Sequence, residues 1–414
     1  MDIVSLIVFC AVIIAAFVCK VNTGYMAIFA ALVLAHIAGV SEKWLISSFG
    51  SSLFLMLLGV MYLFCIAQEN KTLDVLAKKV IALCKGRIKL FPPILFLIGA
   101  VLSAIGPGLI SVTALMAAII VALAKQTGCD PIRLLPFGAL GAFSGGLSPI
   151  TPSGIVAVTT AAANGIEGIE LPLNIAMALN CTLFAVILYF FVFKWHKYQP
   201  APSAQTEGEK APAFTLMQWI TLAGIILVAL LTAFFKVNVG LAAISVSVIL
   251  TIIRAADESI VMKKVPWNTL VMITGVGILI SLVTELGGID LLSRVLSSLV
   301  GEKTVSAIMT VLAGCMSWFS SASGVVMPTL IPTVPDIAAS LSGADVISIT
   351  VGVCVGANMA ALSPLSSCGA LMLSAYASSD DVTAKDRNRV FGQLFAMSAG
   401  SVLFGALLTL LGVF

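Results

Sequence analysis

Two short hydroxyl-rich stretches are the best candidates for a binding site. They are Ser148-Pro149-Ile150-Thr151-Pro152-Ser153-Gly154 and Ser363-Pro364-Leu365-Ser366-Ser367-Cys368-Gly369, and each lies between two apolar runs. Each therefore predicts a membrane helix that breaks partway across the bilayer. Backbone can leave a helix at that depth only where it is buried in protein or lines a polar cavity. A matched pair of such breaks in two halves of a chain indicates the binding site of a transporter.

The broken helix ends offer backbone groups with partial charges of both signs as ligands. Free N–H groups at the start of the second half-helix suit an anion, and carbonyl groups at the end of the first half-helix suit a cation. Because hydroxyls and carbonyls are many and buried titratable groups are few, the sequence favours Na⁺ as the coupling ion, with H⁺ as the alternative. No other cofactor is expected. The candidate Na⁺ ligands are Ser148, Thr151, Gly154, Ser363, Ser366 and Gly369.

A competing interpretation makes the breaks simple packing kinks. In that case their hydroxyls would bond back to their own helices and contact no ligand. Two matched copies, each predicted to face the tip of a helical hairpin, favour the binding interpretation.

Two predicted re-entrant hairpins supply those tips. Residues 91–124 form two arms of about 15 residues each, which is short for full crossings, around the turn Gly106-Pro107-Gly108. Two ordinary crossings with a tight turn are the alternative. Residues 304–340 form the second hairpin, with a serine-rich tip. We expect substrate contacts from the breaks and from both tips, namely Ser103, Gly106, Pro107, Gly108, Ser148, Pro149, Thr151, Pro152, Ser153, Ser320, Ser321, Ser323, Ser363, Pro364, Ser366 and Ser367.

Other polar residues lie in or beside the apolar runs. Asn358 precedes the second break closely and is expected to reach the site, whereas Asn180 and Gln393 are expected to form interhelical hydrogen bonds. Glu69 and Glu285 lie near helix ends, where an anchor is favoured over a coupling group.

Composition defines the class of protein. Apolar residues make up 60% of the chain and charged residues 10%, which predicts an all-α polytopic membrane protein. The first run, Ile3 to Val18, lacks the features of a cleaved leader and is expected to be retained. Nine scattered cysteines and two histidines predict neither a disulfide framework nor a zinc site. The net charge of +3 gives no sign of a nucleic-acid partner, and we expect no enzyme.

The chain divides into two similar halves. A linker rich in Pro and Glu, residues 195–216, separates residues 1–194 from residues 217–414. Two amphipathic stretches, 70–89 and 288–303, are expected to lie on the membrane surface. The predicted crossings are 3–19, 24–40, 49–68, 132–163, 172–193, 217–235, 240–253, 267–286, 345–377 and 390–413, of which 132–163 and 345–377 are broken.

Short identities show that the halves are repeats. Val21-Asn22-x-Gly24 corresponds to Val237-Asn238-x-Gly240, and Leu147-Ser148-Pro149 corresponds to Leu362-Ser363-Pro364. An odd number of crossings in each half makes the repeat inverted. The positive-inside rule places both termini outside the cytoplasm and the linker inside, in the inner (plasma) membrane. Of the 22 Lys and Arg, this orientation leaves outside only Lys43, Lys236, Arg294 and Lys303.

Three stretches resemble the MatC-type dicarboxylate (malonate) carriers of the ion transporter superfamily, which are related to divalent-anion/sodium symporters. These stretches are Ser52 to Gln68, Gly86-Arg87-Ile88 and Gly145 to Ile150. The resemblance implies a homodimer. It also implies a scaffold of residues 1–89 and 217–303, and a transport domain, residues 90–194 and 304–414, that moves as an elevator.

One feature departs from the symporter relatives, which hold carboxylates with Ser-Asn-Thr motifs at both hairpin tips. Here the tips are Ser103-Ala104-Ile105-Gly106-Pro107-Gly108 and Ser320-Ser321-Ala322-Ser323-Gly324. This departure argues against carrying over the relatives' two-carboxylate site to this chain. It does not argue against anion binding.

The sequence therefore predicts a secondary active transporter of a small organic anion, a C3 or C4 dicarboxylate, coupled to Na⁺. A monocarboxylate or an aromatic carboxylate is an alternative substrate. A cation/proton antiporter of the same superfamily is a second alternative, but it would need a membrane-embedded carboxylate at a break. A membrane enzyme is least favoured, because neither break carries a cluster of His, Cys and carboxylate side chains.

Overall fold

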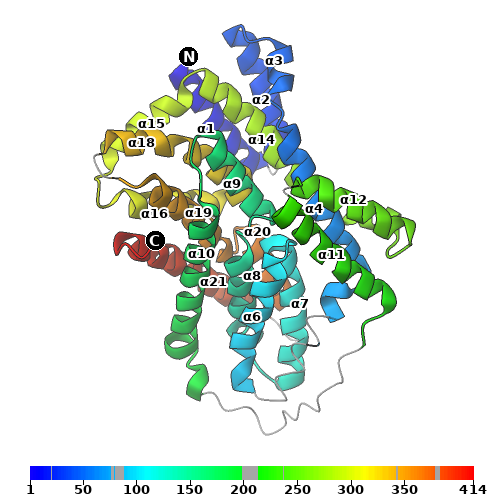
Figure 1. Cartoon of the computed structure of the whole chain (residues 1–414). Helices are drawn as coiled ribbons and strands as arrows, with labels where there is room; N and C mark the ends of the chain where they lie inside the picture. The colour runs from blue at the N-terminus through cyan, green and yellow to red at the C-terminus, as the bar shows by residue number, and fades with distance from the viewer. Residues whose placement is uncertain are drawn as a thin grey trace.

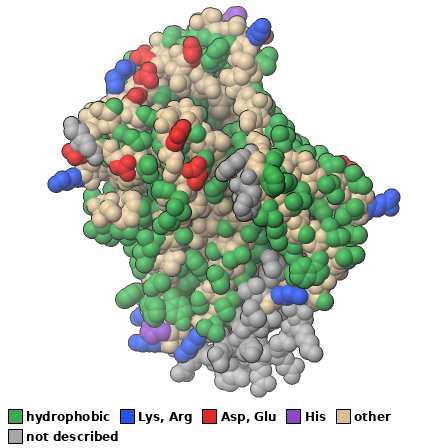
Figure 2. Space-filling model, in the orientation of Figure 1, with side chains coloured by type: hydrophobic (Ala, Val, Ile, Leu, Met, Phe, Trp, Pro, Cys, Tyr) green, Lys and Arg blue, Asp and Glu red, His purple; other side chains and the backbone are tan. Residues whose placement is uncertain are grey.

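A computed structural model describes residues 1–19, 21–75, 79, 88–197, 213–235, 237–341, 344–377 and 383–414. All regular structure in these ranges is helical (Figure 1). Six of the described helices are long and apolar enough to cross a membrane. Large hydrophobic side chains such as Ile14 and Phe29 are more than 60% exposed, and Figure 2 shows hydrophobic side chains over much of the visible surface. The predicted class, a multi-pass helical membrane protein, is confirmed.

The first half contains both elements that the sequence predicts around the first break. Residues 91–124 form a helical hairpin of α6, a short turn and α7, as either a re-entrant hairpin or two crossings would give. The predicted broken helix is observed as α8 and α9. The helices are α1 (Asp2–Cys19), α2 (Thr23–Ala38), α3 (Glu42–Ser47), α4 (Ser51–Glu69), η1 (Ile88–Leu90), α6 (Phe91–Ala104), α7 (Gly108–Thr127), η2 (Pro131–Arg133), α8 (Leu135–Gly145), α9 (Pro152–Ala163), α10 (Glu170–Ile187), η3 (Leu188–Val192) and η4 (Trp195–Lys197).

The second half follows the same order, but the second arm of its hairpin is divided into four pieces. The helices are α11 (Leu216–Phe235), α12 (Val239–Ile252), α13 (Glu258–Lys264), α14 (Trp267–Glu285), α15 (Gly288–Leu299), α16 (Val305–Phe319), η5 (Ala322–Val326), α17 (Met327–Leu330), η6 (Ile331–Thr333), α18 (Val334–Ser340), α19 (Val346–Met359), η7 (Ala360–Leu362), α20 (Ser367–Ala377) and α21 (Ala384–Leu410).

Some predicted boundaries need correction. Helix α21 begins at Ala384, before the crossing predicted for residues 390–413, because Thr383 and Asp386 cap the helix reciprocally. The short helices α3 and α13 were not expected at all. The amphipathic stretch at 70–89 and the linker fall largely outside the described residues. Helix α15 is present where the second amphipathic stretch was predicted.

Each broken helix begins by packing closely on the first arm of its own hairpin. Helix α8 packs along α6, and α19 packs along α16. Glycines permit the approach, since a β-carbon at Gly141 would collide with the carbonyl oxygen of Phe96, and one at Gly356 with that of Thr310. The first half of each break is therefore fixed to its hairpin by direct backbone contact.

Outside these hairpins, helices of the first half of the chain pack directly against helices of the second half. Helix α2 crosses α14 where Gly24 meets Gly275, and α12 crosses α4 where Gly240 meets Gly59. The motif Val-Asn-x-Gly has a role in both places. The side chains of Asn22 and Asn238 accept hydrogen bonds from the backbone of the glycine two residues later, and so cap α2 and α12.

The glycine crossings generate a testable difference between neighbouring positions. In Gly275→Ala the added methyl group would lie 2.5 Å from the backbone oxygen of Gly24, so the helices must separate, at a cost of about 1–3 kcal/mol. We expect a lower apparent melting temperature in detergent. Gly277→Ala is the control, because its methyl group meets nothing within 4 Å. Equal melting temperatures for the two variants would contradict the close crossing.

Candidate functional site

The first break lies between the end of α8 and the start of α9, and the Thr151 side chain bonds backbone groups on both sides of it. The Thr151 hydroxyl donates towards the carbonyl oxygens of Gly146 and Ser148, each 2.7 Å away. Its oxygen accepts a hydrogen bond from the Gly154 N–H at 3.1 Å, which caps α9. This side chain therefore satisfies both carbonyl and amide groups that the broken helix leaves without helical partners.

The second break repeats this arrangement with Ser366 in place of Thr151. The Ser366 hydroxyl lies 2.7 Å from the carbonyl oxygens of Ala361 and Ser363, and its oxygen accepts from the Gly369 N–H at 3.4 Å. A β-carbon at Gly369 would collide with the Ser363 carbonyl, just as one at Gly154 would collide with that of Ser148. Two different hydroxyl residues thus hold the same local backbone geometry.

The hydroxyls of the breaks divide into two groups. Thr151 and Ser366 donate to their own backbone, as the packing interpretation anticipated, and buried Ser363 accepts from the N–H of Leu365 at 3.2 Å. In contrast, the hydroxyl residue Ser148 is half-buried and Ser367 is exposed. Pro149, next to Ser148, is exposed as well. The residues that face open space are therefore not those that shape the breaks.

The first hairpin tip lies directly against the first break. Gly106 and Gly108 have φ angles of 133° and 76°, which L-residues with side chains rarely adopt. A β-carbon at Gly108 would lie 3.0 Å from the ring of Pro152, and one at Gly106 would strike the ring of Phe64 on α4. Nearby Ser103 is fully buried, and its hydroxyl has no hydrogen-bond partner among the described residues.

The second hairpin tip contains a third capped turn. Ser320 is extended, and the Ser321 hydroxyl accepts from the Gly324 N–H at 3.1 Å at the start of the π-helical segment η5. Segments of π-helix occur frequently at functional sites. Ser323 lies within η5 and is 9% exposed. Met272 of α14 packs against Gly324, so this tip contacts α14 as the first tip contacts α4.

The second half of each broken helix packs on the hairpin of the other half of the chain. Helix α9 packs on η5 and α17 of the second hairpin, and α20 packs on α7 of the first. At the start of α7, Gly108 meets Pro152 while Thr113 lies beside Cys368 of α20. Those two α7 residues are about 7.5 Å apart along the helix. The N-termini of α9 and α20 therefore meet the same two turns of α7.

Two buried asparagines lie near the second break without full hydrogen bonding. The Asn358 amide donates to the Cys354 carbonyl at 2.8 Å, but its oxygen has no partner among the described residues. Asn180 on α10 is fully buried beside Gly405, and neither of its polar atoms has a partner in the described part of the chain. The interhelical hydrogen bond predicted for Asn180 is therefore not observed.

Sequence reasoning missed a hydrogen-bonded chain that supports the second break. The Trp318 indole N–H donates to the Ser398 hydroxyl at 2.9 Å, and that hydroxyl donates to the Ala360 carbonyl at 2.9 Å. Ser401, one turn further along α21, donates to the Met359 carbonyl at 3.1 Å. Two serines one turn apart in an apolar helix were the available signal. Trp318 is thereby tied to α21 at the hairpin tip.

Charged groups lie at the edge of this assembly. Glu69, at the end of α4, forms an ion pair with Lys264 of α13, and these side chains are 21% and 43% exposed. Among the described residues, no three His, Cys, Asp or Glu side chains are grouped so that they could hold a metal ion.

Fold and site together define a multi-pass membrane protein built around two broken helices and two helical hairpins. The fold is similar to that of the Alcanivorax borkumensis YdaH transporter in a crystal structure described as having an unusual topology. The TM-score is 0.61 at 13% identity, over 89% of this chain and 87% of that chain. At this identity the likeness concerns the fold alone.

The beginning of the chain also matches a family model. Residues 1–146 match the model described as the N-terminus of the dicarboxylate carrier protein MatC. The chain matches no curated protein. The resemblance to MatC-type carriers is thus confirmed for residues 1–146, a range that contains the first hairpin and ends at the first break.

The capping role of Thr151 can be tested by local stability. Thr151→Val removes the cap while keeping the side-chain shape, and we expect faster hydrogen–deuterium exchange in the first turn of α9, because such caps contribute about 0.5–2 kcal/mol. Thr151→Ser should restore slow exchange. Thr159→Val is the matched control, since that hydroxyl bonds only within α9. Equal exchange in all variants would refute the cap.

Proposed function

We propose that this protein is a secondary active transporter of a small organic anion, a C3 or C4 dicarboxylate, coupled to Na⁺. The observation that carries the proposal is the matched pair of capped helix breaks, whose second halves contact the hairpins of opposite repeats. The match of residues 1–146 to a dicarboxylate carrier model and the likeness to a transporter fold support it.

The proposed substrate site uses the starts of α9 and α20. A helix N-terminus presents free N–H groups and a partial positive charge to an anion. Because both N-termini meet the first two turns of α7, one dicarboxylate would place a carboxylate near each. The half-buried Ser148 and the exposed Ser367 would add hydroxyl donors. This arrangement makes no demand for an Asn or Thr at the hairpin tips.

Na⁺ is the proposed coupling ion. Its ligands would come from the carbonyl-rich ends of α8 and α19, with Ser148, Thr151 and Gly154 in one break and Ser363, Ser366 and Gly369 in the other. Neither break contains a carboxylate or histidine, so a proton would have no evident carrier there. This absence of a titratable carrier favours Na⁺ over H⁺.

The proposed architecture is an inverted repeat that works as an elevator. Reciprocal crossings of α2 with α14 and of α12 with α4 support the repeat, because repeat-related glycines make both contacts. We place the scaffold in residues 1–89 and 217–303 and the transport domain in residues 90–194 and 304–414. A homodimer in the plasma membrane, with both termini outside the cytoplasm, completes the proposal.

Uptake measurements test the function directly. In proteoliposomes, an inward Na⁺ gradient should drive uptake of labelled malonate or succinate, because ion and anion would occupy neighbouring ends of the same breaks. Uptake that follows a proton gradient and ignores Na⁺ would refute Na⁺ coupling. A Na⁺-dependent pH change that no carboxylate stimulates would refute the anion transporter and indicate a cation/proton antiporter.

The same assay tests the assigned hydroxyls. Ser148→Ala and Ser363→Ala should each raise the half-saturating concentration of substrate or Na⁺ about ten- to a hundredfold, since a hydrogen bond to a charged group contributes about 1.5–3 kcal/mol. Ser245→Ala is the control, because Ser245 is exposed and bonds within α12. Elution from a sizing column should be unchanged in all three variants. Unaltered transport by both site variants would count against this site.

The ion pair at the end of α4 gives a further expectation. Glu69→Gln should lower the apparent melting temperature only slightly, because partly exposed ion pairs contribute about 0–1 kcal/mol, and it should leave the Na⁺ dependence of uptake unchanged. Glu285→Gln tests the corresponding position of the second repeat. Loss of Na⁺ dependence in Glu69→Gln would make Glu69 a coupling group rather than an anchor.

A further inference from the structure

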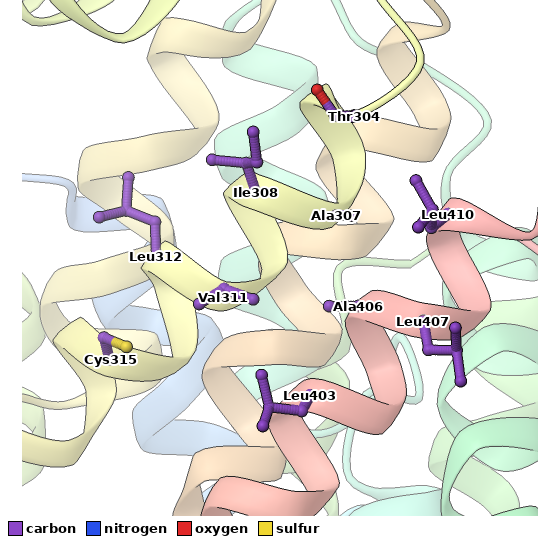
Figure 3. A pocket seen from close by; sticks show the side chains of 10 residues that line it. All are labelled: Thr304, Ala307, Ile308, Val311, Leu312, Cys315, Leu403, Ala406, Leu407 and Leu410. Atoms are coloured by element: carbon purple, nitrogen blue, oxygen red, sulfur yellow. The ribbon is translucent and has the colours of Figure 1, made fainter. Parts of the chain in front are cut away.

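A groove of 690 Å³ runs between α16 and α21, apart from the proposed transport site (Figure 3). Carbon and sulfur side chains from both helices form nearly all of its wall. The lining residues are Ala307, Ile308, Val311, Leu312 and Cys315 of α16, and Leu403, Ala406, Leu407 and Leu410 of α21, with Thr304 at one end.

The groove opens to the outside of the protein. Ile308, Leu403, Leu407 and Leu410 are 39%, 61%, 48% and 51% exposed. Thr304 and Leu410 lie at one end in Figure 3, and Cys315 and Leu403 lie towards the other. In a multi-pass membrane protein, an apolar surface of this kind is in contact with lipid.

The length and position of the groove match one leaflet of a bilayer. From Thr304 to Cys315 an α-helix rises about 17 Å, and half of the hydrocarbon core is about 15 Å thick. Helix α16 begins just after the exposed polar residues Glu302 and Lys303 and leads to the partly buried second hairpin tip. With Lys303 at a membrane surface, the groove would reach to about the depth of one acyl chain.

Charged groups at the Thr304 end suit a zwitterionic head group. Lys303 is exposed beside Thr304 and can pair with a phosphate, and the Thr304 hydroxyl can donate to it. Glu302 is also exposed next to Lys303 and can pair with a positive amine. An anionic head group would meet one favourable and one unfavourable charge. A head group with both charges meets two favourable ones.

We propose that this groove binds one acyl chain of a zwitterionic phospholipid whose phosphate lies at Lys303 and Thr304. The lipid fills the space between α16 and α21, which are joined at the deeper end by the bond from Trp318 to Ser398. It thereby stabilises the position of the second hairpin. The site does not depend on the substrate proposed above.

Native mass spectrometry of the purified protein with added phosphatidylethanolamine tests this site. Wild type should retain one phospholipid per chain beyond the nonspecific population. Ala307→Trp, which fills the groove, and Lys303→Gln, which removes the phosphate partner, should each lower that retained fraction at least fivefold. Ala223→Trp on α11 and Lys43→Gln on α3 are matched controls, because both residues are exposed and lie on helices that do not line the groove. Both controls should retain the lipid.

Several outcomes would overturn the lipid site. One is equal retention by wild type, Lys303→Gln and Lys43→Gln. A second is a change in oligomeric mass in Ala307→Trp with unchanged lipid, which would assign the groove to a protein contact. A third is preferential retention of phosphatidylglycerol, which would contradict the zwitterionic head group. Lys303→Gln alters only an exposed side chain, so it decides the matter if Ala307→Trp does not fold.

Discussion

The constraint on which this structure depends is the need to satisfy backbone polar groups where a helix stops inside a membrane. Water is not available there, and an unpaired carbonyl or amide costs several kcal/mol. Thr151 and Ser366 meet the need locally, each bonding two carbonyl oxygens and one amide of its own turn. At the second hairpin tip, the Ser321 oxygen accepts from one amide, that of Gly324. The non-helical segments are thus fixed by their own side chains.

These fixed turns are assembled into a site by contacts between the halves of the chain. Each broken helix starts on its own hairpin and ends on the hairpin of the other half. Gly106 and Gly108 allow the first tip to touch α4 and the first break, while Trp318 and Ser398 tie the second tip to α21 and the second break. A displacement of either hairpin would therefore change packing contacts at both breaks.

Much of this architecture could be predicted from local sequence signals. The apolar runs, the Gly-Pro-Gly turn and the paired Ser-Pro segments indicated the helices, one hairpin and both breaks, because proline, glycine and hydroxyl residues act on the backbone close to themselves. Which of the hydroxyls also cap the breaks could not be predicted. Thr151 and Ser366 cap the breaks. This role depends on backbone atoms three to five residues away and on the rotamer that brings the hydroxyl to them.

Interactions between distant segments could not be predicted in this way. The bond from Trp318 to Ser398 depends on which helices become neighbours, as does the lack of a partner for the Asn180 amide among the described residues. The polar first turns of α21 were not predicted, because Thr383 and Asp386 form a capping box within a polar segment, where hydropathy gives no signal. The packing of α9 on the second hairpin likewise follows from tertiary structure alone.

The crossings of α2 with α14 and of α4 with α12 have a consequence for biosynthesis. A nascent chain emerges from the ribosome N-terminal end first, so α2 and α4 enter the membrane long before their partners are made. Until then, the surfaces around Gly24 and Gly59 have only lipid or an insertion factor against them. The first half is thus an obligatory intermediate with two unfilled helix-packing sites, and completion of the second half is what commits the protein to its final form.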